Sequence, residues 1–161
     1  MHLRALALIR LLDLAPHPEG GYYREVFRSP RRVRASDAAS DHAAITTIYF
    51  LLVAGQHSRW HRVVSDEIWH YYEGDPLELI WFDAARTVPE HRQLGPASDE
   101  CRPVKIVPGG CWQSARPLGE YTLVGYSVAP GFEFSDFDLL ADAGEKLALV
   151  RARFPELAVL I

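Results

Sequence analysis

The stretch from Gly55 to Gly74 contains the two side chains best suited to chemistry, His61 and Glu67. Apolar and aromatic residues that favour β-strands surround this pair. Imidazole carries protons near neutral pH, and a carboxylate within hydrogen-bond reach fixes its tautomer and raises its basicity. We therefore predict two strands and a tight turn that place an acid–base pair inside an apolar barrel. The alternative is a buried His–Glu hydrogen bond that only stabilises the fold.

Side chains alternate between the two faces of a strand, and this alternation predicts the neighbours of the pair. With Glu67 inward, Trp69 and Tyr71 face inward as well. Arg59 shares the phase of His61. The opposite face would then hold Ile68, His70 and Tyr72. An aromatic wall with a few polar groups is typical of a site for a small organic ligand, although each aromatic residue would serve equally well in a core.

Short strand patterns separated by turn signals run through most of the chain, with a helical pattern near each end. The strand-like segments are residues 22–28, 43–54, 77–82, 104–107 and 121–129, and the helical segments are 3–14 and 141–154. Residues 29–41 are expected to form a loop, and residues 83–92 a loop or hairpin. Gly125 inside the last strand indicates a bulge or a close approach of two backbones. The pattern predicts one mainly β domain, residues 1–161, with a helix in 1–15, a barrel in 20–138 and a helix in 141–154.

Charge and composition exclude several classes of partner. The net charge of -4 and the pI of about 6.0 argue against nucleic-acid polymers and anionic membranes, which favour a basic face. No apolar run reaches the roughly 18 residues of a membrane span, and the first residues lack a signal-peptide cleavage pattern. Cys101 and Cys111 are expected to be free thiols in a reducing compartment. We therefore expect a cytoplasmic protein with neither a membrane nor a nucleic-acid polymer as partner.

The spacing of the opening stretch resembles the first sequence motif of the cupin superfamily, G-x5-H-x-H-x3-E-x6-G. Its five defined positions are occupied by Gly55, His61, Val63, Glu67 and Gly74, so that Val63 replaces the second histidine. The stretch is therefore similar to a cupin motif that has lost one imidazole.

The second cupin motif, G-x5-P-x-G-x2-H-x3-N, is matched in part. Pro108 and Gly110 fit it, Gln113 stands at the histidine position, and the outer positions hold Arg102 and Pro117. Four segments together are similar to the DUF985 or cupin-5 family, from about residue 8 to residue 140: H-P-E-G-G-Y-Y-R-E, S-D-E-I-W-H-Y-Y-E-G-D-P-L, V-P-G-G-C-W-Q and A-P-G-F-E-F-S-D-F-D-L. This resemblance implies a cupin double-stranded β-helix, a jelly-roll barrel that is usually dimeric. It implies no known reaction.

Metal-binding cupins commonly use three histidines and one glutamate. Here Val63 has no donor atom, and Gln113 offers a neutral amide oxygen that suits transition metals less well than imidazole. We therefore expect no cofactor, with a divalent metal at His61, Glu67 and Gln113 as the alternative. Gln113 faces inward by its motif position and joins the expected ligand-binding residues. The remaining residues expected at the ligand, near the mouth of the barrel, are Tyr23, Phe132 and Phe134.

Three functions follow from this pattern. The first is a metal-independent enzyme, isomerase- or epimerase-like, in which His61 and Glu67 catalyse proton transfer on a sugar-like, nucleotide-sugar or keto-type substrate. The second is a non-catalytic protein that binds a metabolite or nucleotide. The third is a metal-dependent cupin enzyme with a degenerate site. Exposed apolar residues on the outward strand face and in both terminal segments also predict a homodimer.

Overall fold

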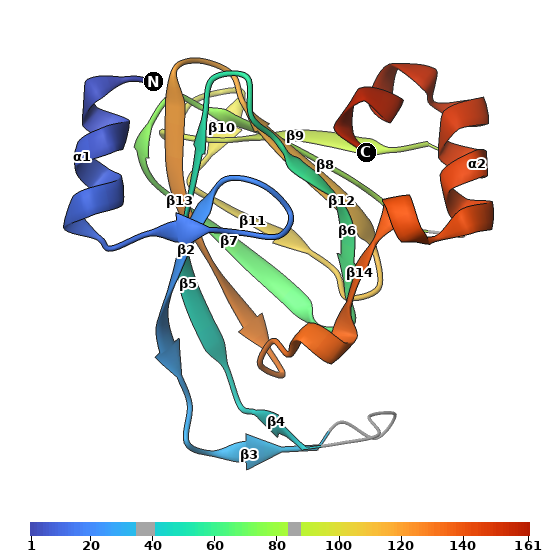
Figure 1. Cartoon of the computed structure of the whole chain (residues 1–161), viewed down its shortest axis with the longest axis horizontal. Coiled ribbons are helices and arrows are strands. Elements are labelled where there is room, and N and C mark those ends of the chain that lie inside the picture. Colours follow the sequence, from blue (N-terminus) through green and yellow to red (C-terminus); the bar gives the residue numbers. More distant parts are fainter. Residues whose placement is uncertain (35–40, 84–87) are drawn as a thin grey trace.

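Two six-stranded sheets pack face to face in the computed structural model, which describes residues 1–34, 41–83 and 88–161 (Figure 1). The first sheet has the order β1 (Ala15–Pro16), β2 (Tyr22–Arg28), β5 (Thr46–Val53), β13 (Tyr121–Ala129), β7 (Asp66–Gly74) and β11 (Val104–Val107). The second has the order β10 (Cys101–Arg102), β9 (Glu90–Leu94), β8 (Leu77–Phe82), β12 (Trp112–Pro117), β6 (Ser58–Val63) and β14 (Phe137–Leu139). The predicted jelly-roll fold is confirmed, although the two sheets do not close into one continuous ladder.

The His61–Glu67 stretch crosses from one sheet to the other. β6 and β7 follow each other in the chain, yet β6 pairs with β12 and β14, whereas β7 pairs with β13 and β11. Side chains from the two strands therefore meet across the space between the sheets. The predicted alternation along β7 is confirmed, because Glu67 and Trp69 are buried whereas Ile68 and Tyr72 are exposed.

One helical segment packs on part of the outer face of each sheet, and in Figure 1 α1 and α2 lie on opposite sides of the β-strands. α1 (Leu3–Leu11) buries Ala5 and Leu8 against the first sheet. The second sheet is covered by η2 (Leu140–Asp142), α2 (Gly144–Arg153) and η3 (Pro155–Leu160). No helix within the described ranges is long and apolar enough to cross a membrane.

The C-terminal segment explains why the outward side chains of β6 and β12 are also apolar. Trp60 and Trp112 point away from the space between the sheets, yet each is almost fully buried under this segment together with Ile80 and Phe82. The Trp60 indole N–H donates a hydrogen bond to the carbonyl of Leu157 over 3.1 Å. Burial of these side chains fixes the C-terminal segment against the sheet.

Most predicted elements are present, with differences at their ends. The predicted first helix stops at Leu11 rather than residue 14, because Asp13 adopts a left-handed backbone conformation with φ of 51°. The predicted second helix starts as the 3-10 turn η2, and the strand predicted from residue 43 divides into β4 (His42–Ala43), which pairs with β3 (Arg32–Val33), and β5. The predicted loops at 29–41 and 83–92 fall partly outside the described residues, and the described end of the second belongs to β9.

Gly125 makes the close approach that the sequence predicts. A Cβ atom at this position would lie 2.6 Å from the carbonyl oxygen of Ile48 and 2.7 Å from the ring of Tyr72. The nearby irregularity in the pairing of β13 with β7 falls between Leu123 and Val124. β13 can therefore sit tightly between β5 and β7 and present Tyr126 and Val128 to the interior.

Candidate functional site

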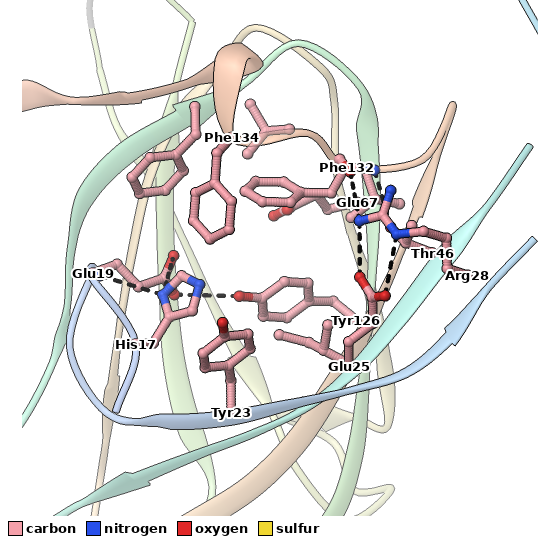
Figure 2. Close-up of a pocket in the computed structure, with 14 residues that line it drawn as sticks. His17, Glu19, Tyr23, Glu25, Arg28, Thr46, Glu67, Tyr126, Phe132 and Phe134 are labelled. Atoms are coloured by element: carbon pink, nitrogen blue, oxygen red, sulfur yellow. Dashed lines mark hydrogen bonds and ion pairs between the residues drawn. The ribbon is translucent and has the colours of Figure 1, made fainter. Parts of the chain in front are cut away.

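A cavity of about 270 Å³ lies between the two sheets, next to the segment that links β13 to β14. The first sheet provides Tyr23, Glu25, Arg28, Thr46, Ile48, Glu67, Tyr126 and Val128, the second sheet provides Val63 and Phe137, and the connecting segments provide His17, Glu19, Phe132 and Phe134. Figure 2 shows two polar ends. On one side, His17 and Glu19 lie close to the hydroxyl groups of Tyr23 and Tyr126, and the Tyr126 hydroxyl donates to Glu19. On the other side, Arg28 pairs with Glu25.

The loop before β2 carries Glu19 into the interior. Gly20 and Gly21 have φ angles of +110° and +69°, a region that glycine adopts without strain. A Cβ atom on Gly20 would lie only 2.5 Å from the carbonyl oxygen of His57, so the loop can approach the start of β6 only with glycine there. The backbone N–H of Arg59 donates to the carbonyl of Glu19 over 2.7 Å and holds the loop in place.

The Glu19 carboxyl group, with a residue exposure of 1%, is the centre of a buried polar network. Its Oε1 accepts hydrogen bonds from Ser58 Oγ at 2.9 Å and from the Tyr126 hydroxyl at 3.4 Å. Its Oε2 lies 3.4 Å from His61 Nε2 and 3.6 Å from His17 Nδ1. Burial raises the pKa of Glu19 to about 8, because the hydrogen bonds to the carboxylate only partly offset its desolvation. Glu19 therefore retains its proton at neutral pH.

His61 lies behind Glu19 and is not among the residues that line the cavity. Its Nδ1 is 2.8 Å from the carbonyl oxygen of Arg59, so the proton belongs on Nδ1 and the Nε2 lone pair faces Glu19. Burial lowers the pKa of His61, and its ring stacks on Phe137 with centroids 5.5 Å apart. A protonated Glu19 can thus donate to a neutral His61. Any effect of His61 on a ligand would pass through Glu19 or Glu67.

Glu67 enters the cavity from the opposite sheet. The side-chain amide of Gln113, a residue that faces His61 in the β12–β6 ladder, donates to Glu67 Oε2. Burial raises the pKa of Glu67 to about 7, with His61 opposing and Glu19 adding to that rise. The indole N–H of Trp69 lowers this pKa slightly but makes no hydrogen bond of normal geometry. Glu67 is only 2% exposed, and within the described parts of the chain its Oε1 has no hydrogen-bond partner.

Two further polar atoms reach the cavity without a partner. Within the described ranges, neither the Tyr23 hydroxyl nor His17 Nε2 makes a hydrogen bond, although both residues line the cavity. His17 Nδ1 accepts the backbone N–H of Glu19 at 3.3 Å, which leaves the ring proton on Nε2. Burial lowers the pKa of His17 to about 3, so this ring is neutral. Both atoms are open to the cavity, where a polar ligand would pair with them and with Glu67.

The structure brings some of the predicted site residues together. Glu67, Tyr23, Phe132 and Phe134 line the cavity, and the buried side chains of His61 and Gln113 lie directly behind it. The others lie elsewhere. Arg59 donates to the carbonyl of Pro18 on the loop, Trp69 packs in the core, and the Tyr71 hydroxyl donates to the carbonyl of Gly74 at the far end of β7.

His61 and Glu67 come from different sheets and interact electrostatically, without a hydrogen bond between them in the described structure. Instead, the carboxylate nearest His61 is Glu19. Sequence reasoning missed Glu19 and His17 because loop residues have no alternating phase. Their only signal is the H-P-E-G-G segment, whose two glycines allow an unusual backbone next to a carboxylate.

The donor atoms do not fit a cupin metal centre. His61 Nε2 faces Glu19, Glu67 Oε2 accepts a hydrogen bond from the Gln113 amide, and Val63 offers only methyl groups. Across the described residues, no group of three or more His, Cys, Asp or Glu side chains is arranged to hold a metal ion. A transition metal needs imidazole or carboxylate lone pairs that converge on one point.

Comparison with known proteins places this fold in a family. A family model described as "Cupin superfamily (DUF985)" matches residues 6–140. A hypothetical protein from Leishmania major is 32% identical, with a TM-score of 0.82, and the match covers 98% of this chain and 96% of that one. Protein SO0799 from Shewanella oneidensis is 31% identical, with a TM-score of 0.79 and coverage of 96% and 92%.

More distant structures share the fold alone. Oxalate decarboxylase from Bacillus subtilis is 18% identical, with a TM-score of 0.60, and the match covers 93% of this chain and 37% of that one. A search of proteins with curated functions finds no match. The family match spans both sheets and every residue of the cavity. The chain belongs to the DUF985 family of the cupin superfamily.

Proposed function

We propose that this cupin binds a small organic molecule and transfers a proton on it without a metal, with Glu67 as the acid–base group. The observation that supports this most is the state of the Glu67 side chain: it is buried, its Oε1 is unpaired within the described structure, and it lines a cavity. Burial brings the pKa of Glu67 to about 7, where a general acid–base group populates both protonation states at neutral pH.

The surrounding groups suit proton abstraction next to a carbonyl. Such a step places negative charge on the carbonyl oxygen, and nearby donors stabilise it. The Tyr23 hydroxyl and the Nε2–H of His17 are free to donate into the cavity. Glu67 would remove the proton and return it, as in an isomerase or epimerase. His61 would act as a positioning residue by orienting Glu19.

The size of the cavity limits the substrate. A volume of about 270 Å³ lies just below the range for small-molecule sites, which is roughly 300–1,000 Å³. It favours a sugar-sized or keto-type molecule over a complete nucleotide sugar. Aromatic side chains dominate one wall, where Phe132 and Phe137 pack edge to face with Phe134. A ring-shaped or unsaturated substrate would stack there.

Proton exchange measured by NMR in deuterated water tests this proposal. A thermal-shift screen of small metabolites first identifies ligands, because binding to the folded state raises the melting temperature. Each ligand is then incubated with the protein, and loss of a C–H signal next to its carbonyl reports catalysed exchange. Glu67→Gln should slow the exchange by about 10²–10⁴-fold at ligand concentrations that saturate the variant, since general acid–base catalysis contributes that much. Undiminished exchange in this variant would contradict the role of Glu67.

The same experiment separates the two alternatives. A ligand that binds in the cavity without any exchange would support a non-catalytic metabolite-binding protein. A metal-dependent enzyme would show about one equivalent of a divalent metal after purification and would lose exchange on chelation. His61 Nε2 faces Glu19 and Glu67 Oε2 is bound to Gln113, which supports an enzyme that works without a metal.

A further inference from the structure

Among the described residues of the cavity wall, one carboxyl group, Glu67, can carry an unbalanced negative charge. Glu19 keeps its proton at neutral pH, Glu25 pairs with Arg28, and the described lining holds no other arginine and no lysine. His17 adds no positive charge, since burial lowers the pKa of its ring to about 3. An anionic ligand would therefore lose its hydration without gaining a free cationic partner.

Arg28 is already committed to the protein. Its Nε and Nη2 donate to the two oxygens of Glu25 at 3.1 Å and 2.9 Å, and its Nη1 donates to Glu133 at 2.9 Å. Nη2 also donates to the carbonyl of Phe132 at 3.1 Å. Two carboxylates thus offset one guanidinium. Figure 2 shows this group at the side of the cavity away from His17 and Glu19.

The inner side offers an acceptor and aromatic faces. Glu67 presents an oxygen that has no partner in the described structure, and the side chain is almost fully buried. Aromatic rings surround the space beside it: Tyr23, Tyr126, Phe132, Phe134 and Phe137. Aromatic faces attract cations, and a planar cation both stacks on a ring and donates to a carboxylate in its own plane.

From these features we infer that the ligand carries a planar cationic head group, such as an amidine, a guanidine or a protonated aminoheterocycle, that stacks on the aromatic wall and lies close enough to Glu67 for the carboxylate to offset its charge. This inference rests on the cavity being the ligand site, as proposed above. It adds the chemical class of the ligand. It also predicts that binding releases a proton near pH 7, because a bound cation favours the ionised form of the Glu67 carboxyl group.

Three small aromatic probes of one shape and different charge test the inference: benzamidine, which is cationic, benzamide, which is neutral, and benzoate, which is anionic. Calorimetric titration of the whole protein should show benzamidine binding at least tenfold more tightly than benzamide, and benzoate more weakly than both. Titration in buffers of different ionisation enthalpy should reveal proton release with benzamidine. The affinity for benzamidine should rise between pH 6 and pH 8, as Glu67 becomes ionised.

Two variants locate the site. Glu67→Gln should reduce the affinity for benzamidine at least tenfold and abolish its preference over benzamide, whereas the exposed control Glu120→Gln should change neither. Phe134 is 57% exposed, so Phe134→Ala should fold normally. It should weaken benzamidine binding two- to fivefold through loss of a cation–π contact. This second variant keeps the test decisive if Glu67→Gln proves unstable.

Several results would overturn the inference. Benzamide or benzoate binding as tightly as benzamidine would show that the cavity does not select for positive charge, while it remained a ligand site. Benzamidine binding that neither variant affects would place the cation elsewhere, and failure of all three probes at millimolar concentration would exclude a planar cationic head group. The proton-exchange experiment with Glu67→Gln measures turnover and not affinity. Its result therefore tests the proposed acid–base function separately from the charge of the ligand.

Discussion

The buried carboxyl group of Glu19 should make the protein less stable as the pH rises, and Glu19→Gln should remove that effect. Burial raises the pKa of Glu19 from 4.5 to about 8 in the folded state. The folded state therefore holds this proton more tightly than the unfolded chain. The resulting stabilisation is complete below pH 4.5 and is lost as the pH rises through about 8.

The expected magnitude follows from the same values. At 1.36 kcal/mol per pH unit, the full loss is about 5 kcal/mol, of which about 3 kcal/mol falls between pH 6 and pH 9. Glutamine imitates the protonated acid at all pH values. Its oxygen can accept from Ser58 and its amide can donate towards His61 Nε2, so the network should persist in the variant.

Urea unfolding followed by tryptophan fluorescence measures this difference. The free energy of unfolding is determined at pH 6 and pH 9 for wild type, Glu19→Gln and the exposed control Glu156→Gln. Relative to wild type, Glu19→Gln should gain about 3 kcal/mol between the two pH values, whereas the control should gain nothing. Titration of groups that do not interact with Glu19 cancels in this comparison. Equal pH dependence in Glu19→Gln and wild type would refute the raised pKa and the neutral Glu19–His61 contact.

Two further predictions concern the loop and the assembly. Gly20→Ala should lower the melting temperature by roughly 5 °C or more in calorimetry, because the new Cβ meets the carbonyl of His57 at a positive φ angle. The control Gly144→Ala places its Cβ in open space at the start of α2 and should leave the melting temperature unchanged or slightly higher. Equal effects of the two substitutions would contradict the argument. We also propose a homodimer through the outer face of the first sheet, where Ile106 on the edge strand β11 pairs with Ile68 and both side chains are exposed. Ile106→Asp should therefore give a monomer in light scattering, whereas the control Leu118→Asp should stay dimeric. A monomeric wild type would refute this proposal.

Much of the fold could be predicted because its strands obey a simple alternation. The inward phase of Glu67 followed from counting along a strand, and that of Gln113 from its motif position. The close approach at Gly125 followed from a glycine inside a strand. The burial of Trp112 did not follow, because it depends on a C-terminal segment that packs over the sheet from a distant part of the sequence.

The site was harder to predict because it combines three separate parts of the chain. Alternation along β6 and β7 identifies His61 and Glu67 as buried, yet it does not reveal that the two strands belong to opposite sheets. Glu19 comes from a loop, where a side chain has no fixed phase. Whether a buried carboxyl group keeps its proton depends on every neighbour within a few ångströms, and those neighbours become known only with the tertiary structure.

The C-terminal cover of the second sheet has a consequence for sequence divergence. The tryptophans that it buries, Trp60 and Trp112, lie inside the matched family region, whereas α2 and η3 lie beyond residue 140. Their immediate neighbours in the chain, His61 and Gln113, point to the opposite face of the same strands. Changes in the tail can therefore be accommodated at Trp60 without altering the cavity. Relatives that carry different tails should differ at position 60, and at positions 61 and 113 only when the ligand changes.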